Sequence, residues 1–304
     1  MENELQSTCE ELKKALKEKG DVLINFVVSR SRKERVEIKN AYKTFFGKEL
    51  KDEINHALTG NFRRVIIDLF RSPEERDAIY LYKAMKGAGT DEETIIEIIC
   101  SRPNRELIKI KEAYKNLYNE DLEKKVASDT SGNLKKILTS LLQCQRSENA
   151  TPVESECRKT AEKLYKAGEG KLGTDEATFN KVFALSSPAE LFSINTHYSQ
   201  FGTRTLREAV AKEFSGGIKH ALNTILEAHI SPTNYYARKI NKSVKGLGTN
   251  DKMLIRNICG RADIDMKEIR LCYQSLFEKD MIADIKGDTS GEYQKILVAL
   301  ASKD

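Results

Sequence analysis

The chain contains one stretch of sequence four times, and this internal repetition constrains its fold more than any other feature. Four segments align without a gap, each running from a tyrosine to a glycine eighteen positions later. The tyrosines are Tyr42, Tyr114, Tyr198 and Tyr273, and the glycines are Gly60, Gly132, Gly216 and Gly291. Eight positions after each tyrosine stands an apolar residue, in order Leu50, Leu122, Leu206 and Met281. The sequence therefore predicts four related units of about seventy residues each.

The composition and periodicity of the units are typical of helices. Among 304 residues there are five prolines and no tryptophan, and 32% of the residues are charged. In the second unit apolar residues recur at helical spacing in three stretches, Ile95, Ile98 and Ile99, then Leu107, Ile110, Tyr114 and Leu117, then Leu134, Ile137, Leu138 and Leu141. We therefore expect an all-α fold with about five short helices in each unit.

The alignment also predicts where the units begin and end. We place them at residues 1–72, 73–143, 158–231 and 232–304. Residues 144–157 are polar and without periodicity, and we interpret them as a linker that divides the molecule into halves.

Several classes of function find no support in the sequence. The N-terminus is acidic and the longest apolar runs are too short to span a bilayer, so we expect a cytoplasmic protein. A net charge of +5 without a basic stripe interleaved with aromatic residues argues against nucleic-acid binding. The six cysteines lack CxxC spacing, and we expect reduced thiols; Cys100, Cys259 and Ala184 occupy one aligned position, which indicates a small buried pocket. No P-loop, dinucleotide-binding fingerprint or EF-hand is present and the four histidines are scattered, so we do not expect an enzyme.

Three of the units share a glycine loop. The loops read "MKGAGTDEET" at 85–94, "GKLGTDEATF" at 170–179 and "VKGLGTNDKM" at 244–253, and each should join the first helix of its unit to the second. In each unit an acid follows the second loop glycine by forty positions, in the pairs Gly89 with Asp129, Gly173 with Glu213, and Gly248 with Asp288. The first unit lacks the loop at 15–26 and carries Ala57 at the acid position. Because loop and acid are absent together, we expect them to form one site.

A hard cation explains this pairing. Ca²⁺ binds six to eight oxygens in flexible geometry, including backbone carbonyls and a carboxylate, and glycine lets successive carbonyls turn toward one point. The candidate ligands are the carbonyls of Met85, Gly87 and Gly89 with Asp129; those of Gly168, Lys171 and Gly173 with Glu213; and those of Val244, Gly246 and Gly248 with Asp288. We thus expect about three Ca²⁺ ions.

Each candidate site has only one formal negative charge, so its affinity for free Ca²⁺ should be weak and a lipid phosphate oxygen should complete it. Three divalent ions would raise the net charge from +5 to +11, which a negatively charged membrane attracts. Lipid and Ca²⁺ must then strengthen each other's binding. Around the loops, Leu172 and Leu247 are candidates to enter the headgroup region, and Lys86, Lys171 and Lys245 to assist electrostatically.

At these residues the chain resembles the annexin family over nearly its whole length, through the four repeats, the three GxGT loops with their distant acids and the "DTSG" endings. The resemblance implies four annexin-type repeats forming a curved disc, with calcium loops on the convex face. It implies reversible, calcium-dependent binding to anionic phospholipids such as phosphatidylserine, self-association on membranes, and roles in membrane aggregation, vesicle traffic or repair. It also implies secondary calcium ions near Thr90 with Glu92, Thr174 with Glu176, and Thr249 with Asp251.

Two features depart from the family pattern. The first repeat is degenerate at its calcium loop, and the N-terminal arm is very short, because Thr8 and Glu11 form a capping box at the start of the first helix. We therefore expect no partner to be recruited through an N-terminal helix. A second capping box is expected from Thr90 and Glu93.

Two alternatives remain open. One is a cytoskeletal or scaffold protein of helical repeats, in which the loops are only structural. The other is a calcium-permeable pore, for which the resemblance points to the polar residues Asp77, Arg102, Arg261 and Asp265, although Tyr80 replaces an acid often found there.

Overall fold

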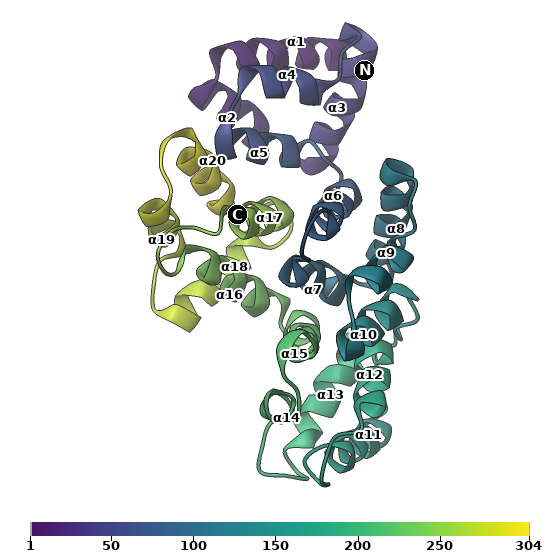
Figure 1. Ribbon diagram of the computed structural model, residues 1–304. Helices are drawn as coiled ribbons and strands as arrows, with labels where there is room; N and C mark the ends of the chain where they lie inside the picture. The colour runs from purple at the N-terminus through teal and green to yellow at the C-terminus, as the bar shows by residue number, and fades with distance from the viewer. Residues whose placement is uncertain (1, 304) are drawn as a thin grey trace. The chain divides into compact units, whose positions relative to one another are not determined.

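The structure is a computed structural model that describes residues 2–303, which form twenty α-helices and no strand (Figure 1). Repeat 1 contains α1 (Glu2–Glu18), α2 (Gly20–Val28), α3 (Arg32–Phe46), α4 (Leu50–Ala57) and α5 (Gly60–Leu69). Repeat 2 contains α6 (Pro73–Met85), α7 (Glu92–Ser101), α8 (Asn104–Tyr118), α9 (Leu122–Asp129) and α10 (Gly132–Leu142). Repeat 3 contains α11 (Glu154–Ala167), α12 (Glu176–Leu185), α13 (Pro188–Tyr198), α14 (Leu206–Glu213) and α15 (Gly216–Ile230). Repeat 4 contains α16 (Pro232–Val244), α17 (Asp251–Arg261), α18 (Met266–Phe277), α19 (Met281–Asp288) and α20 (Gly291–Ala301). The predicted all-α fold with five helices in each repeat is confirmed.

The aligned residues have the same structural role in every repeat. Each aligned tyrosine lies on the third helix and is at most 1% exposed. The apolar residue eight positions later begins the fourth helix and is also buried. The aligned glycine begins the fifth helix with a positive φ, for example +55° at Gly132. The repeated spacing therefore fixes where the third, fourth and fifth helices meet.

The chain folds into two compact units that do not follow its order. One unit combines the chain up to Arg76 with the chain from Tyr236 onward, and the other contains Asp77–Tyr235. In the first unit, α2 and α5 of repeat 1 pack against α20 and α17 of repeat 4. In the second unit, α7 and α10 of repeat 2 pack against α15 and α12 of repeat 3.

The expectation that residues 144–157 divide the molecule into halves is wrong, because they lie inside the second unit. Arg146, which is buried, donates hydrogen bonds to the carbonyls of Ser186 (2.6 Å) and Phe183 (2.8 Å) in repeat 3. Residues 154–157 are the first turn of α11 rather than linker. Because residues 144–157 are polar and show no periodicity, the sequence alone could not reveal that Arg146 donates to buried carbonyls of repeat 3.

The expected capping box of Thr8 and Glu11 is also wrong. Helix α1 begins at Glu2, so Thr8 lies within it and its hydroxyl donates to the Glu4 carbonyl at 2.9 Å. Glu11 instead pairs with Arg30 at 3.1 Å. Leu117 also differs from the buried position that the apolar spacing predicts. It lies in the last turn of α8 and is 44% exposed, although it continues the apolar stripe.

Within residues 2–303, none of the helices combines the length and the hydropathy needed to span a bilayer.

His229 in α15 is partly buried against repeat 2. Its Nε2 lies 3.1 Å from the carbonyl oxygen of Cys100 in α7, and because a carbonyl only accepts, the neutral imidazole donates. Burial, assisted by the positive charge of Arg146, lowers the pKa of His229 from 6.5 to about 3. The histidine is therefore neutral in the folded protein at every pH near neutrality.

We expect Arg146→Ala to lower the free energy of unfolding by about 2–4 kcal/mol, because two buried carbonyls lose a charged donor. Urea unfolding at pH 7 measures the change. Arg158→Ala, on the exposed face of α11, is the control and should change it by less than about 0.5 kcal/mol. A loss below that limit in Arg146→Ala would contradict the role given to the buried arginine.

We expect acidification to destabilise the protein through His229. Between pH 6.5 and 3 the unfolded chain binds a proton at this histidine and the folded chain does not, so its contribution is full above 6.5 and is lost as the pH falls toward 3. The unfolding free energy of wild type should therefore fall more steeply between pH 6.5 and 4.5 than that of His229→Gln, by up to about 1.4 kcal/mol per pH unit. Equal slopes in urea titrations would show that the histidine titrates normally in the folded state.

Candidate metal centre

The three glycine loops follow the C-termini of the first helices in repeats 2, 3 and 4, as predicted. The last four carbonyls of an α-helix have no intrahelical donor, and Met85 and Val244 are the last residues of α6 and α16. Each loop is closed by one backbone hydrogen bond, from Asp91 N to Ala84 O (2.9 Å), from Asp175 N to Ala167 O (2.7 Å) and from Asn250 N to Ser243 O (2.8 Å). The carbonyls between these closures are held in a tight turn.

The second loop glycines of repeats 2 and 4 are required by the backbone conformation rather than by lack of space. Gly89 has φ +89° and Gly248 has φ +82°, and a Cβ added at either would meet no atom within 4 Å. L side chains rarely adopt such φ values, so only glycine turns the carbonyls here without strain.

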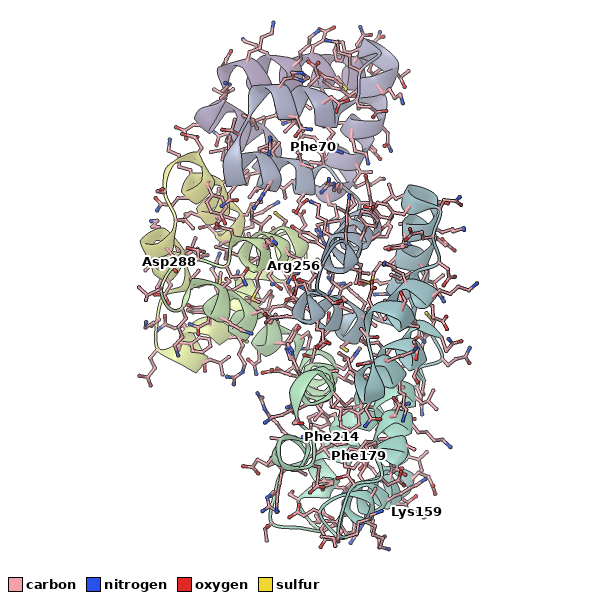
Figure 2. The ribbon with its side chains drawn as sticks, viewed as in Figure 1. Phe70, Lys159, Phe179, Phe214, Arg256 and Asp288 are labelled. Carbon is pink, nitrogen blue, oxygen red and sulfur yellow. The ribbon has the colours of Figure 1, made fainter. Side chains whose placement is uncertain are left out.

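The distant acid is the last residue of the fourth helix in each site. Helices α9, α14 and α19 end at Asp129, Glu213 and Asp288, and Figure 2 labels Asp288. The C-terminus of a helix carries a partial negative charge, and a carboxylate adds a full one. Two helix C-termini and a carboxylate therefore meet at each loop, which makes each site attractive to a cation.

A threonine hydroxyl joins loop and acid in all three sites. Thr90 Oγ1 donates to the carbonyl of Asp129 (3.2 Å), Thr249 Oγ1 donates to the carbonyl of Asp288 (2.8 Å), and Thr174 Oγ1 donates to Oε2 of Glu213 (2.6 Å). The forty-residue spacing seen in the sequence thus corresponds to a direct hydrogen bond. Sequence reasoning missed this role, although the same threonine after the second glycine of every loop was the available signal.

The predicted capping box of Thr90 and Glu93 is wrong, since the Thr90 hydroxyl is engaged with Asp129. The cap of α7 is Asp91, which accepts a hydrogen bond from the backbone nitrogen of Thr94 at 3.0 Å. Asp175 and Asn250 cap α12 and α17 in the same way. The residue after the threonine therefore starts the second helix in each site.

The carboxylates of Asp129 and Asp288 each have one oxygen without a hydrogen bond from residues 2–303. Oδ2 of Asp288 is buried and accepts no hydrogen bond from the described residues. Oδ2 of Asp129 is also buried without a hydrogen bond, and it lies 3.1 Å from the Lys125 ammonium. Buried oxygens in this state are costly unless a cation or donor satisfies them, and oxygen is the donor that hard cations prefer. The residues present therefore fit a Ca²⁺ ion.

Repeat 3 has a longer loop with additional contacts. A Cβ at Gly168 would lie 3.3 Å from Cγ of Glu213 and 3.2 Å from the Phe179 ring, so this glycine allows the acid to approach the backbone closely. Phe179 and Phe214 stack edge to face beside it, with ring centroids 5.0 Å apart (Figure 2). The Gly168 carbonyl already accepts a hydrogen bond from Lys171 N at 3.0 Å, which leaves it one free lone pair.

Glu169 anchors this longer loop. Its Oε1 accepts from Arg204 at 2.7 Å and from Thr203 at 3.3 Å, and its side chain is 10% exposed. A Cβ at Gly202 would lie 3.0 Å from Glu169 Oε2, so a glycine is needed where the carboxylate inserts. Sequence reasoning gave Glu169 no role.

The other predicted site residues surround the loops. Glu92 and Glu176 are the first residues of α7 and α12, and Asp251 is the first residue of α17. Leu172 and Leu247 are fully exposed at the loop tips, at 102% and 109%. The loop lysines Lys86, Lys171 and Lys245, one in each of the three loops, are exposed as well.

Repeat 1 contains neither part of the site. Helices α1 and α2 are joined by Lys19 alone, and α4 ends at Ala57. A junction of one residue leaves no loop carbonyls to gather. Within residues 2–303, the loop sites included, no three histidine, cysteine, aspartate or glutamate side chains gather around one point.

The polar residues to which a pore was assigned have ion-pair partners, and the aligned thiols are buried. Arg102 pairs with Asp77 at 2.8 Å, and Arg261 pairs with Asp265 at 2.8 Å, each within its own compact unit. The predicted buried pocket at the aligned position is confirmed, because Cys100, Cys259 and Ala184 are at most 2% exposed. Burial raises the pKa of both thiols, which makes them unreactive.

The helices define an all-helical protein of four repeats, and comparisons with known proteins agree with this fold. The annexin family model matches residues 7–69, 76–141, 159–225 and 235–300. Annexin A13 of Homo sapiens is 40% identical over 292 residues, covering 95% of this chain and 92% of that protein. Annexin A7 of Homo sapiens is 38% identical over 295 residues, covering 96% of this chain and 60% of that protein. The solved structure of annexin III is 31% identical and superposes with a TM-score of 0.94, covering 99% of this chain and 94% of that one.

The chain therefore belongs to the annexin family. The four matched stretches correspond to the four repeats of five helices. The chain spans 92% of the length of annexin A13 but only 60% of that of annexin A7.

We expect Asp91→Ala to lower the free energy of unfolding in chelator by about 1 kcal/mol, because α7 loses its cap. Asp91→Asn should retain the cap, as Asn250 does in repeat 4, and should cost only a few tenths of a kcal/mol. Urea unfolding of both variants provides the comparison. Equal losses in the two variants would show that charge, rather than capping, is what Asp91 contributes.

Proposed function

We propose that this annexin binds anionic phospholipid membranes reversibly in response to Ca²⁺, through three sites formed by a glycine loop and a distant carboxylate. The single observation that supports this most strongly is the threonine hydrogen bond that holds each loop against the residue bearing the acid, seen in three repeats. It brings together loop carbonyls and a carboxylate, the donor set that suits Ca²⁺. Calcium-dependent phospholipid binding is also the general activity of the annexin family.

We assign the ligands as follows. In repeat 2 they are the carbonyls of Met85, Gly87 and Gly89 with the carboxylate of Asp129; in repeat 3 those of Gly168, Lys171 and Gly173 with Glu213; and in repeat 4 those of Val244, Gly246 and Gly248 with Asp288. Secondary ions are proposed at Thr90 with Glu92, Thr174 with Glu176, and Thr249 with Asp251. Repeat 1 is proposed to bind none at this position, because it has neither loop nor acid.

The charge of the sites explains why a membrane is needed. One carboxylate per site leaves a bound Ca²⁺ half neutralised, so a phosphate oxygen of an anionic lipid such as phosphatidylserine completes it. Bound Ca²⁺ supplies the positive charge that the anionic surface attracts. Each lipid contact strengthens Ca²⁺ binding and is strengthened by it, and several weak sites acting together make the response steep.

The loop tips fit contact with headgroups. Leu172 and Leu247 are fully exposed apolar side chains on otherwise polar loops, and their insertion would bury apolar area. Lys171 and Lys245 share these two loops and Lys86 stands in the repeat 2 loop, and all three add attraction to anionic lipid. We propose that the protein is cytoplasmic, is recruited peripherally when Ca²⁺ rises, and self-associates on the membrane.

We expect Asp129→Ala, Glu213→Ala and Asp288→Ala together to abolish calcium-dependent sedimentation with phosphatidylserine vesicles, because each site loses its one charged ligand. Circular dichroism should show unchanged helical content. Wild type should pellet with Ca²⁺ and return to the supernatant with chelator.

The matched control replaces the same number of exposed glutamates away from the loops, Glu10→Ala, Glu112→Ala and Glu268→Ala, and should pellet as wild type does. Ala57→Asp alone should change little, since repeat 1 has no loop. Continued calcium-dependent pelleting of the triple site variant would refute the ligand assignment. Pelleting of wild type that ignores chelator would favour a scaffold role.

A further inference from the structure

The three sites differ at one position that faces the acid. Four residues before the acid, one turn earlier on the fourth helix, the chain has Lys125 in repeat 2, Ala209 in repeat 3 and Asp284 in repeat 4. Side chains four apart on a helix are neighbours. The same scaffold therefore places a cation, an uncharged residue or an anion beside the carboxylate.

In repeat 2 the cation engages the carboxylate directly. Lys125 Nζ lies 3.1 Å from Oδ2 of Asp129, with the two side chains 32% and 20% exposed. The same ammonium donates a hydrogen bond to the other carboxylate oxygen, Oδ1, at 3.4 Å, whereas Oδ2 accepts no hydrogen bond from the described residues and has only the charge of the ammonium beside it. A divalent ion that binds Oδ2 must either displace the Lys125 ammonium or bind beside it, and either event lowers the affinity of the site for the ion.

In repeat 4 the neighbour has the opposite charge. Asp284 is fixed by Tyr273, whose hydroxyl donates to Asp284 Oδ2 at 2.6 Å, and Asn241 of α16 in turn donates to that hydroxyl at 2.9 Å. The second carboxylate is thereby held one helical turn from Asp288. Burial and Asp284 both raise the pKa of Tyr273, so the phenol stays protonated and continues to donate.

In repeat 3 the neighbour is neutral. Ala209 is buried at 1% exposed, so this position has no side chain that reaches the acid. The additional acid of this loop, Glu169, is already paired with Arg204. The summed formal charge of the acid and the residue four positions before it is therefore zero in repeat 2, −1 in repeat 3 and −2 in repeat 4.

We infer that Lys125 is an internal competitor for the repeat 2 site, and that the three sites load with Ca²⁺ in the order repeat 4, repeat 3, repeat 2. This inference rests on the proposed function, because it concerns the affinity of the same sites. Ligand charge is what orders the affinities of calcium sites with similar geometry. The repeat 2 site then binds Ca²⁺ only at the highest Ca²⁺ concentrations, or when lipid is already bound through repeats 3 and 4.

The experiment isolates one site at a time in the full chain. In the Glu213→Ala, Asp288→Ala background only the repeat 2 site keeps its acid. Tyrosine-sensitised Tb³⁺ luminescence gives its affinity for Tb³⁺, and displacement by Ca²⁺ gives its affinity for Ca²⁺, both without lipid. Lys125→Ala should raise the Ca²⁺ affinity about two- to five-fold, the range that a partly exposed ion pair supports, and raising the ionic strength should shrink the difference.

Lys124→Ala is the matched control, because Lys124 is the exposed neighbour on the same helix and its loss changes net charge equally. It should leave the affinity unchanged. In the Asp129→Ala, Glu213→Ala background, Asp284→Asn should weaken the repeat 4 site about two- to five-fold, while its amide oxygen still accepts from Tyr273.

The inference would be overturned, and the proposed site left intact, if Lys125→Ala and Lys124→Ala had equal Ca²⁺ affinities while Asp129→Ala abolished binding. The inference and the proposed site would both be overturned if repeat 2 bound no ion, or if binding persisted in Asp129→Ala. A loading order measured in the single-site backgrounds that places repeat 2 before repeat 4 would also overturn the inference.

Discussion

In each of three repeats, one threonine hydroxyl ties the end of the fourth helix to the loop after the first helix. Without that contact, the acid and the loop carbonyls would be separate surface features forty residues apart. With it, two helix C-termini and a carboxylate face one point, and their charges add. The surrounding helices serve this arrangement, since the buried tyrosine of the third helix and the apolar first residue of the fourth set where the acid lies.

The repeats show how one backbone scaffold holds different electrostatics. Repeat 1 keeps the helices and loses the loop, with Lys19 alone joining α1 to α2. Repeat 3 keeps the loop and adds a carboxylate that Arg204 neutralises. Repeats 2 and 4 share loop length and capping geometry, yet the side chain beside the acid is Lys125 in one and Asp284 in the other. Stability and site chemistry are thus set by different positions of the same helix.

Helix number, loop position and buried positions that repeat in the chain could be predicted from the sequence, because three or four copies separate a structural requirement from chance, whereas the repeated threonine contact was missed. The number of helices, the place of the loops and the burial of Cys100 all follow this rule. Features present once could not be predicted. The buried hydrogen bonds of Arg146 depend on carbonyls of repeat 3, which no local pattern reveals. Capping was misassigned because Thr90 and Asp91 are both good caps in isolation, and only the contact with Asp129 decides between them.

The distribution of cysteines offers a practical route to study the protein on a membrane. Four of the six thiols are buried, whereas Cys144 and Cys272 are partly accessible. Cys144 belongs to the unit Asp77–Tyr235 and Cys272 to the other. A fluorophore or spin label on each would report the separation of the two units in solution and on vesicles, without any engineered cysteine.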